Sequence, residues 1–214
     1  MCTIVSVNNR WKTGRLEAFS DGVFAIAITL LVLEIDIPDS GFDNLWAGVL
    51  SQWPSYLAYV TSFLTIGVTW LHHHLIFRRT AWLDSMVMRL NLLLLMLVAF
   101  LPFPTMLMAR GLDKTTDAER VAVVFYGIVL LVIAVTMFAI WHQATRRQLL
   151  EPNVTDAEVR AVTRLTLPIV GYNVAVVVVA LFAPKAAVFG YLLIALVALF
   201  RQHGEIYEPS ESGD

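Results

Sequence analysis

The stretch from Arg15 to Ile37, R-L-E-A-F-S-D-G-V-F-A-I-A-I-T-L-L-V-L-E-I-D-I, decides the fold class of this chain. Its last 21 residues would extend about 31 Å as an α-helix, which matches a bilayer core about 30 Å thick. The segment nevertheless carries Ser20 and Asp21 near one end and Thr29 near its middle. An ionisable group inside a membrane helix needs a buried partner or water, so we expect this helix to line a path through the membrane.

The composition of the whole chain is that of an integral membrane protein. Of its 214 residues, 58% are hydrophobic and 15% are charged, and the mean hydropathy is +0.70. Soluble domains average about 45–50% apolar and about 25% charged residues. We therefore expect an all-α protein that lies almost wholly in the lipid bilayer. Neither the net charge of −2 nor any basic patch with interleaved aromatic residues indicates nucleic-acid binding.

Six apolar segments predict six transmembrane helices. Their expected ranges are 15–37, 46–77, 83–108, 118–143, 163–183 and 186–201. Pro38 and the turn formers at 39–41 are expected to end the first helix, and 144–162 is expected to be a polar connection. The chain then divides into a loosely ordered cytoplasmic tail at 1–14, a transmembrane domain at 15–201 and a disordered acidic tail at 202–214.

The placement of lysine and arginine predicts the orientation. Six helices put both termini on one side, and that side carries eleven basic residues: Arg10, Lys12, Arg15, Arg78, Arg79, Arg89, Arg146, Arg147, Arg160, Arg164 and Arg201. The other side carries four: Arg110, Lys114, Arg120 and Lys185. Basic residues are enriched in cytoplasmic loops, so both termini are expected in the cytoplasm. The outer end of the first helix has an acidic mouth that favours cations: Glu34, Asp36, Asp39 and Asp43.

Three branched apolar residues of the first helix suggest a constriction. Ile26, Leu30 and Leu33 follow one another at i, i+4 and i+7, and Thr29 lies beside Leu30. Several copies of this helix around an axis would turn these positions into apolar rings over about 10 Å, with a hydroxyl ring nearby. The same spacing is also typical of ordinary helix packing.

Polar residues of the next two helices are candidate partners for Ser20 and Asp21. Arg15 is the nearest donor in sequence, while Trp70, His73 and His74 share one face of the second helix. The third helix offers Asn91 and Arg89. A network of these groups would satisfy them away from water and fix the tilt of the first helix.

Metal binding and catalysis find little support in the sequence. Consecutive helical residues point about 100° apart, so His72, His73 and His74 cannot converge on one ion. Cys2 is the single cysteine, which excludes a cysteine metal site and an intrachain disulfide. We find no nucleophile elbow, zinc-protease motif or phosphate loop. The expectation is therefore no enzyme, no cofactor and no metal.

The motif R-L-E-A-F-S-D, with Arg15, Phe19, Ser20 and Asp21, resembles the R-x-x-x-F-S-D signature of the endosomal/lysosomal potassium channels of the transmembrane protein 175 type. W-L-H-H-H-L-I-F at 70–77, Asn91 and L-P-F-P at 101–104 are similar to the second and third helices of that family. The resemblance is dense over 15–108 and loose beyond it.

The resemblance implies a homotetramer of six-helix subunits, as in the bacterial branch of the family, with the first helix lining a central pore. It assigns the constriction to Ile26, Leu30 and Leu33, and the filter hydroxyl to Thr29. The polar network that positions the pore helix would contain Arg15, Phe19, Ser20, Asp21, Trp70 and Asn91, with the choice between His73 and His74 left open. Permeant K⁺ and a modest preference for it over Na⁺ are further implications.

The prediction is a potassium-permeable channel that conducts passively and whose partners are its own copies, the bilayer and monovalent cations. Two rival functions remain. One is a proton-coupled transporter that uses Asp21 and His73 as relay groups. The other is a non-conducting membrane scaffold, which would leave these polar residues unused.

Overall fold

The computed structural model describes residues 11–36, 43–112 and 114–206, with side chains placed up to residue 200. Its elements, in chain order, are α1 Gly14–Leu30, the 3-10 turn η1 Leu31–Glu34, α2 Leu45–Ser51, α3 Trp53–Phe77, α4 Ser85–Phe100, α5 Pro102–Gly111, α6 Thr116–Arg146, α7 Asp156–Phe182 and α8 Pro184–Ile206. Only isolated backbone bridges supplement the helices in this part of the chain. The predicted all-α class is confirmed.

Two predicted continuous helices are each divided in two, and proline accounts for both breaks. The range 46–77 is interrupted at Gln52, and Pro54 occupies the first turn of α3. The range 83–108 is interrupted at Leu101, directly before Pro102, which opens α5. Proline has no N–H to donate into the preceding turn and its ring crowds that turn, so the helix is broken there.

The other helix ends also differ from the prediction. The first helix leaves helical geometry at Ile35, before its predicted end at residue 37, after its last turn tightens into η1. A polar connection was predicted up to residue 162, but α7 begins at Asp156, because Thr155 and Glu158 form a capping box. Pro184 is the first residue of α8, and this helix continues to Ile206 rather than ending at 201. The predicted turn at 38–41 and the tail beyond 206 lie outside the described residues.

Backbone pairing ties three connections together at one end of the bundle. The N–H of Leu83 donates to the carbonyl of Trp11 over 2.8 Å, and the N–H of Ala81 donates to Leu149 over 2.8 Å. The chain just before α1 was predicted to be a loose tail, which is wrong for Trp11. Residues 1–10 of that predicted tail lie outside the described part.

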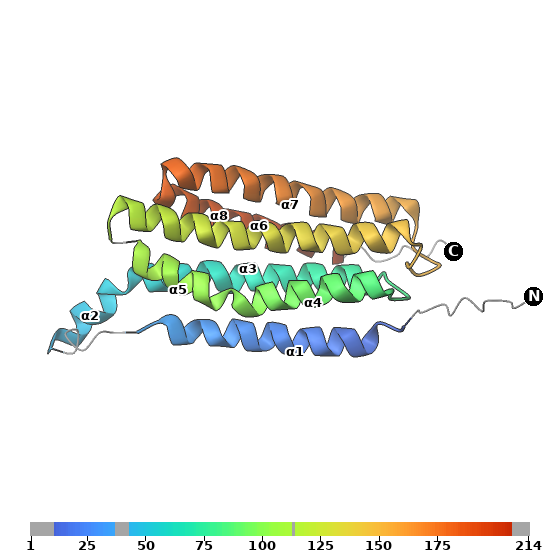
Figure 1. Cartoon of the computed structure of the whole chain (residues 1–214), viewed down its shortest axis with the longest axis horizontal. Coiled ribbons are helices and arrows are strands. Elements are labelled where there is room, and N and C mark those ends of the chain that lie inside the picture. Colours follow the sequence, from blue (N-terminus) through green and yellow to red (C-terminus); the bar gives the residue numbers. More distant parts are fainter. Residues whose placement is uncertain (1–10, 37–42, 113, 207–214) are drawn as a thin grey trace, which may run out of the picture.

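The helices run roughly parallel to one another, with α1 along one side of the bundle and α7 along the opposite side (Figure 1). Helix α1 packs mainly on α3 and α4, whereas α6 contacts α4, α5, α7 and α8. Among the described residues, four helical segments are long and apolar enough to cross a membrane: Gly14–Glu34, Ser85–Gly111, Thr116–Arg146 and Asp156–Phe182. The chain is therefore a membrane protein whose first apolar helix sits at the edge of its own bundle.

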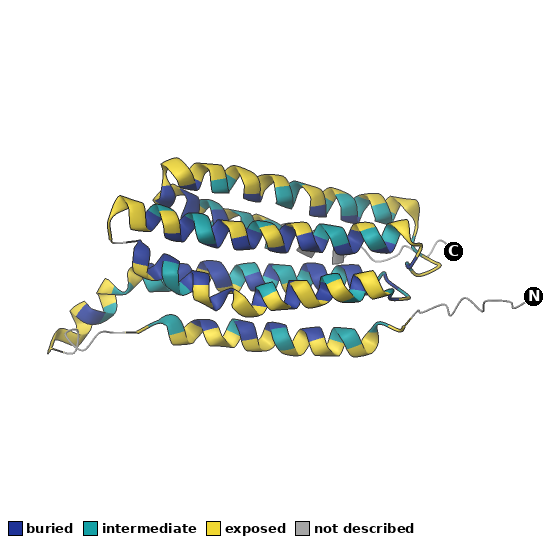
Figure 2. Cartoon of the chain, in the orientation of Figure 1, coloured by how far each residue is buried: buried dark blue, intermediate teal, exposed yellow. Residues whose placement is uncertain are grey.

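Helix α1 is attached to the bundle along one narrow face. Its buried residues are Ser20, Phe24, Ala27 and, in the following turn, Leu31, spaced three to four apart. These residues join a core that includes Leu94, from α4, and Ile66, from α3. Most of the remaining surface of α1 is exposed or half-buried in the single chain (Figure 2).

Candidate functional site

The face of α1 opposite its buried stripe carries the predicted constriction residues. Ile26 is 62% exposed, Leu30 40% and Leu33 70%. Thr29 is exposed on the same side, and its hydroxyl donates to the backbone carbonyls of Ala25 and Ile26 at 3.1 and 2.9 Å. The single chain therefore presents these four side chains outward, and none of them belongs to its own core.

A directed chain of hydrogen bonds joins α1 to α3 through α4. The Ser20 hydroxyl donates to the Leu16 carbonyl over 2.8 Å, so the same oxygen accepts from Asn91 Nδ2 over 3.0 Å. This orientation turns Asn91 Oδ1 towards His73, whose Nε2 donates to it over 2.9 Å. Ser20, His73 and Asn91 are all buried, and the Ser20 hydroxyl, the Asn91 amide and His73 Nε2 each have a partner within the protein.

A second polar link lies at the surface beside the buried one. Trp70 Nε1 donates to Asp21 Oδ1 over 2.8 Å, and both side chains are exposed in the single chain. The two links together hold the first half of α1 at neighbouring points of α3. They bring together five of the predicted network residues: Ser20, Asp21, Trp70, His73 and Asn91.

The three consecutive histidines make three different sets of contacts. His73 is stacked on Phe77 with ring centroids 4.2 Å apart, and it lies 5.5 Å from the ring of Phe24. His74 is exposed and stacks on Trp70 at 6.1 Å. His72 bonds Thr166 of α7 through Nε2 over 2.8 Å. The open choice between His73 and His74 is thus resolved geometrically, since His73 is the one bonded to Asn91.

Two predicted members of the network stand apart from these links. Phe19 is 55% exposed, and Arg15 is exposed one turn before it. Among the ion pairs of the described residues, Arg120 with Asp117 and Lys185 with Glu119, none involves Arg15. No hydrogen bond or ion pair of the described residues joins Arg15 to Ser20 or Asp21.

The structure adds contacts that the sequence analysis missed. Phe24 and Phe77 enclose the His73 ring, and Thr166 is the partner of His72. Helical spacing from Ser20 to Phe24 and from His73 to Phe77, four residues each, could have indicated the two aromatic contacts. The described residues contain no group of three or more histidine, cysteine or acidic side chains arranged to hold a metal ion.

Comparisons with known proteins show which family this chain is similar to. The family model described as endosomal/lysosomal potassium channel TMEM175 matches residues 15–102. A potassium channel of Streptomyces collinus is 44% identical over 176 residues, which covers 81% of this chain and 85% of that protein. A potassium channel of Chamaesiphon minutus is 47% identical over 165 residues, which covers 75% and 80% of the two proteins.

A solved structure extends the similarity to the fold. The crystal structure of a lysosomal potassium-selective channel TMEM175 homolog from Chamaesiphon minutus has a TM-score of 0.79 and 41% identity to this chain. The similarity covers 89% of this chain and 97% of that one. The predicted family and the predicted membrane-embedded helical fold are therefore confirmed.

The vertebrate relatives are named proton channels, and this chain matches a smaller share of their length. The endosomal/lysosomal proton channel TMEM175 of Danio rerio is 35% identical over 151 residues, which covers 65% of this chain and 29% of that protein. The bacterial relatives, by contrast, are matched over most of their length. The chain therefore belongs to the TMEM175 family, whose members are ion channels and not enzymes.

Proposed function

We propose that this chain is one subunit of a homotetrameric, potassium-permeable channel of the bacterial inner membrane. Each subunit would cross the bilayer six times, with α2–α3 and α4–α5 each acting as one interrupted span, and both termini would be cytoplasmic. Four copies of α1 would surround a central axis along which ions move passively. The relatives named as potassium channels support K⁺ as the permeant ion.

The observation that carries this proposal is the outward face of α1. Ile26, Leu30 and Leu33 are among the exposed large hydrophobic residues, and Arg15 and Asp21 are exposed on the same helix. A helix that only faced lipid would gain nothing from an exposed carboxylate, whose desolvation is costly. Exposed charge next to exposed branched side chains instead fits an aqueous axis that is narrowed by apolar rings.

Thr29 is suited to contact a cation. Its hydroxyl hydrogen is used by the backbone carbonyls of Ala25 and Ile26, so its oxygen turns lone pairs outward. Four such oxygens, one per subunit, would offer partial replacement of hydration water beside the rings of Ile26 and Leu30. Asp36 and Asp43 are exposed near the outer end of this path and would raise the local cation concentration.

The buried links give the network a positioning role. Ser20, Asn91 and His73 connect α1 to the bundle at distances of 2.9 and 3.0 Å, and Trp70 adds a bond to Asp21. A helix held by specific hydrogen bonds has a defined rotation, and rotation decides which side chains face the axis. In this proposal the network residues do not contact the permeant ion, except for Asp21, which is exposed.

Potassium flux from liposomes tests the proposal. Purified protein should release K⁺ without any second solute gradient, and Ile26→Asn should raise the flux and reduce the preference for K⁺ over Na⁺, because an apolar ring becomes wettable. Val178→Asn is the matched control, since Val178 is also β-branched and exposed but lies on α7, across the bundle from α1 (Figure 1). Absence of K⁺ flux in both the native protein and Ile26→Asn would contradict the proposal.

The names of the vertebrate relatives suggest protons as a second permeant ion of the same channel. The second candidate function is a proton-coupled transporter, which would need Asp21 and His73 to exchange protons. In the described residues, however, Asp21 is bonded to Trp70 and His73 to Asn91. A pH-sensitive dye inside the same liposomes separates the cases. A transporter gives saturating flux that requires both gradients, whereas a channel passes either ion alone.

A further inference from the structure

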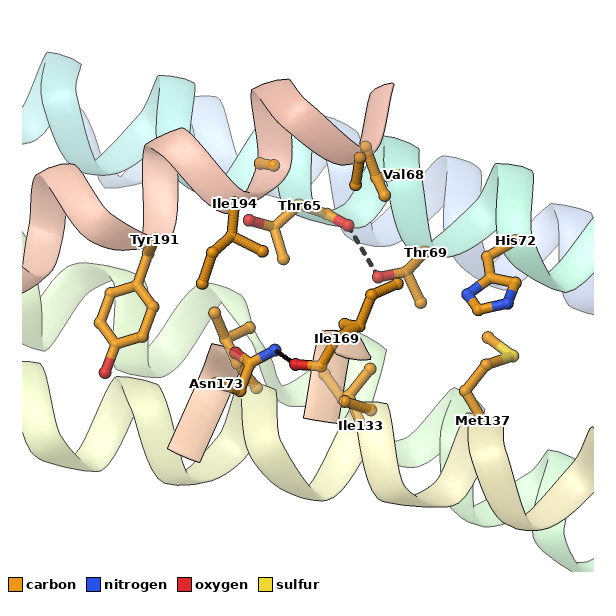
Figure 3. Close-up of a pocket in the computed structure, with 14 residues that line it drawn as sticks. Thr65, Val68, Thr69, His72, Ile133, Met137, Ile169, Asn173, Tyr191 and Ile194 are labelled. Carbon is orange, nitrogen blue, oxygen red and sulfur yellow. Dashed lines mark hydrogen bonds between the residues drawn. The ribbon is translucent and has the colours of Figure 1, made fainter. Parts of the chain in front are cut away.

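A partly open cavity of about 60 Å³ lies between α3, α6, α7 and α8 (Figure 3). Its polar lining comes from Thr65, Thr69 and His72 of α3 and from Asn173 of α7, and Ile133 and Met137 of α6 close another side. Helix α1 contributes nothing to this lining. The cavity is therefore separate from the exposed α1 face, and the inference drawn from it holds whether or not the chain conducts potassium.

The two threonines present oxygen lone pairs to this cavity. The Thr65 hydroxyl donates to the Thr61 carbonyl over 2.7 Å, and the Thr69 hydroxyl donates to the Thr65 carbonyl over 2.7 Å. Each hydroxyl has one hydrogen, which these bonds consume. Both side chains can therefore only accept further hydrogen bonds.

Asn173 also presents an acceptor. Its Nδ2 donates to the carbonyl of Ile169 over 2.9 Å, which fixes the amide orientation because a carbonyl cannot donate (Figure 3). The side chain is only 5% exposed. No side-chain hydrogen bond of the described residues ends at its Oδ1, which is therefore free to accept one.

His72 brings no free N–H to the cavity in its neutral form. The Thr166 hydroxyl donates to the Val162 carbonyl over 2.7 Å, so its oxygen must accept from His72 Nε2. A neutral imidazole carries one N–H, and the second nitrogen is then an acceptor. The one other hydroxyl of the lining, on Tyr191, points away from the cavity in Figure 3 and packs over Gly127.

The polar wall of the cavity thus consists mainly of acceptors, and the second hydrogen of Asn173 Nδ2 is left to donate. Acceptors without partners are costly at bilayer depth, where no lipid group can donate to them. Water both donates and accepts hydrogen bonds, and one molecule needs about 15 Å³ of such space. A volume of about 60 Å³ therefore has room for more than one water molecule.

We propose that each subunit binds a small cluster of water molecules in this cavity, held by the oxygens of Thr65, Thr69 and Asn173. The site is a second hydrated region of the protein, between the helices of each subunit and away from α1. An ammonium or alkali cation is also attracted to these acceptor oxygens, so the experiment must separate water from a cation.

A high-resolution structure of the protein in lipid nanodiscs, prepared with choline as the sole cation, tests the proposal. We expect several separate densities within hydrogen-bond distance of Thr69 Oγ1 and Asn173 Oδ1, unchanged when K⁺ is supplied. One strong density that appears only with K⁺ or ammonium would overturn the proposal in favour of a cation site. An empty cavity, or continuous density of an acyl chain, would overturn it as well.

Thr69→Val is the test variant, because valine keeps the shape of threonine and removes the oxygen that would bind water. We expect the density beside residue 69 to disappear in this variant while the remaining fold is unchanged. Thr136→Val is the control: Thr136, like Thr69, donates to its i−4 carbonyl over 2.7 Å, but it does not line the cavity. Equal density in Thr69→Val and in the control would contradict the assignment of these waters to the acceptor wall.

Discussion

At the scale of single residues, the direction of each hydrogen bond explains which side chains form the buried network between α1, α4 and α3. Ser20 gives its hydrogen to Leu16, so it must accept from Asn91, and Asn91 must then accept from His73. The sequence predicted Ser20, Asn91 and a histidine but could not choose between His73 and His74. That choice depends on the rotation of α3, and helical neighbours point about 100° apart, so only packing decides which one is buried.

Removing the Asn91 amide should reduce the stability of the protein, because a buried donor on His73 is left without an acceptor. In Asn91→Leu, His73 Nε2 keeps its hydrogen but loses its acceptor, and the imidazole is 1% exposed. We expect the free energy of unfolding in detergent to fall by about 1–3 kcal/mol. The double variant Asn91→Leu with His73→Phe removes both partners and should recover part of that loss. Equal or greater destabilisation of the double variant would contradict the proposed bonding.

The surface link between Trp70 and Asp21 should contribute less to stability. Trp70 is 38% exposed, and Asp21 can be solvated when the indole N–H is removed. Trp70→Phe keeps an aromatic ring beside His74 but removes the N–H donor and part of the ring surface, so we expect a loss of about 0.5–1.5 kcal/mol. The same unfolding assay measures it, and a loss larger than that of Asn91→Leu would contradict this ranking of the two links.

At the scale of elements, apolar run length predicted where the helices lie, and local backbone chemistry decided where they end. The breaks at Gln52 and Leu101 are caused by the prolines that come shortly after them in the sequence. The bilayer-length apolar runs had instead favoured continuous helices. The early start of α7 follows the T-x-x-E pattern of Thr155 and Glu158, a capping box that was overlooked within a polar stretch. The pairing of Trp11 with Leu83 had no local signal, because it joins segments distant in sequence.

The contribution of the capping box at the start of α7 to stability should be measurable by itself. Thr155 Oγ1 accepts from the N–H of Glu158 over 3.3 Å, and the Glu158 carboxylate accepts from the N–H of Thr155 over 2.8 Å. Thr155→Ala should reduce the free energy of unfolding by about 1 kcal/mol and speed hydrogen exchange in the first turn of α7.

Thr145→Ala is the control for the capping prediction. Thr145 lies near the end of α6 and bonds only to carbonyls of its own helix, so alanine should change stability by less than about 0.5 kcal/mol. Unchanged exchange at the start of α7 in Thr155→Ala would show that the cap does not hold this turn.

At the scale of the whole molecule, the two sides of α1 are chemically different. Ser20, Phe24 and Ala27 attach it to α3 and α4, while Ile26, Thr29 and Leu33 face outward. The sequence predicted the outward set by family resemblance, because helical spacing alone is equally typical of packing. A single chain has no axis, so the proposed pore exists only in the assembly, and native mass spectrometry should detect four copies per particle.

Thiol accessibility in the assembled protein tests the central claim most directly. In a Cys2→Ser background, Ile26→Cys should react rapidly with a charged, membrane-impermeant thiol reagent, and the reaction should block K⁺ flux, because this residue faces the aqueous axis. Ala27→Cys, one residue on and 1% exposed, should react slowly and leave the flux intact. If Ile26→Cys reacts only with lipid-soluble reagents while K⁺ flux continues, α1 faces the bilayer and the proposed pore is wrong.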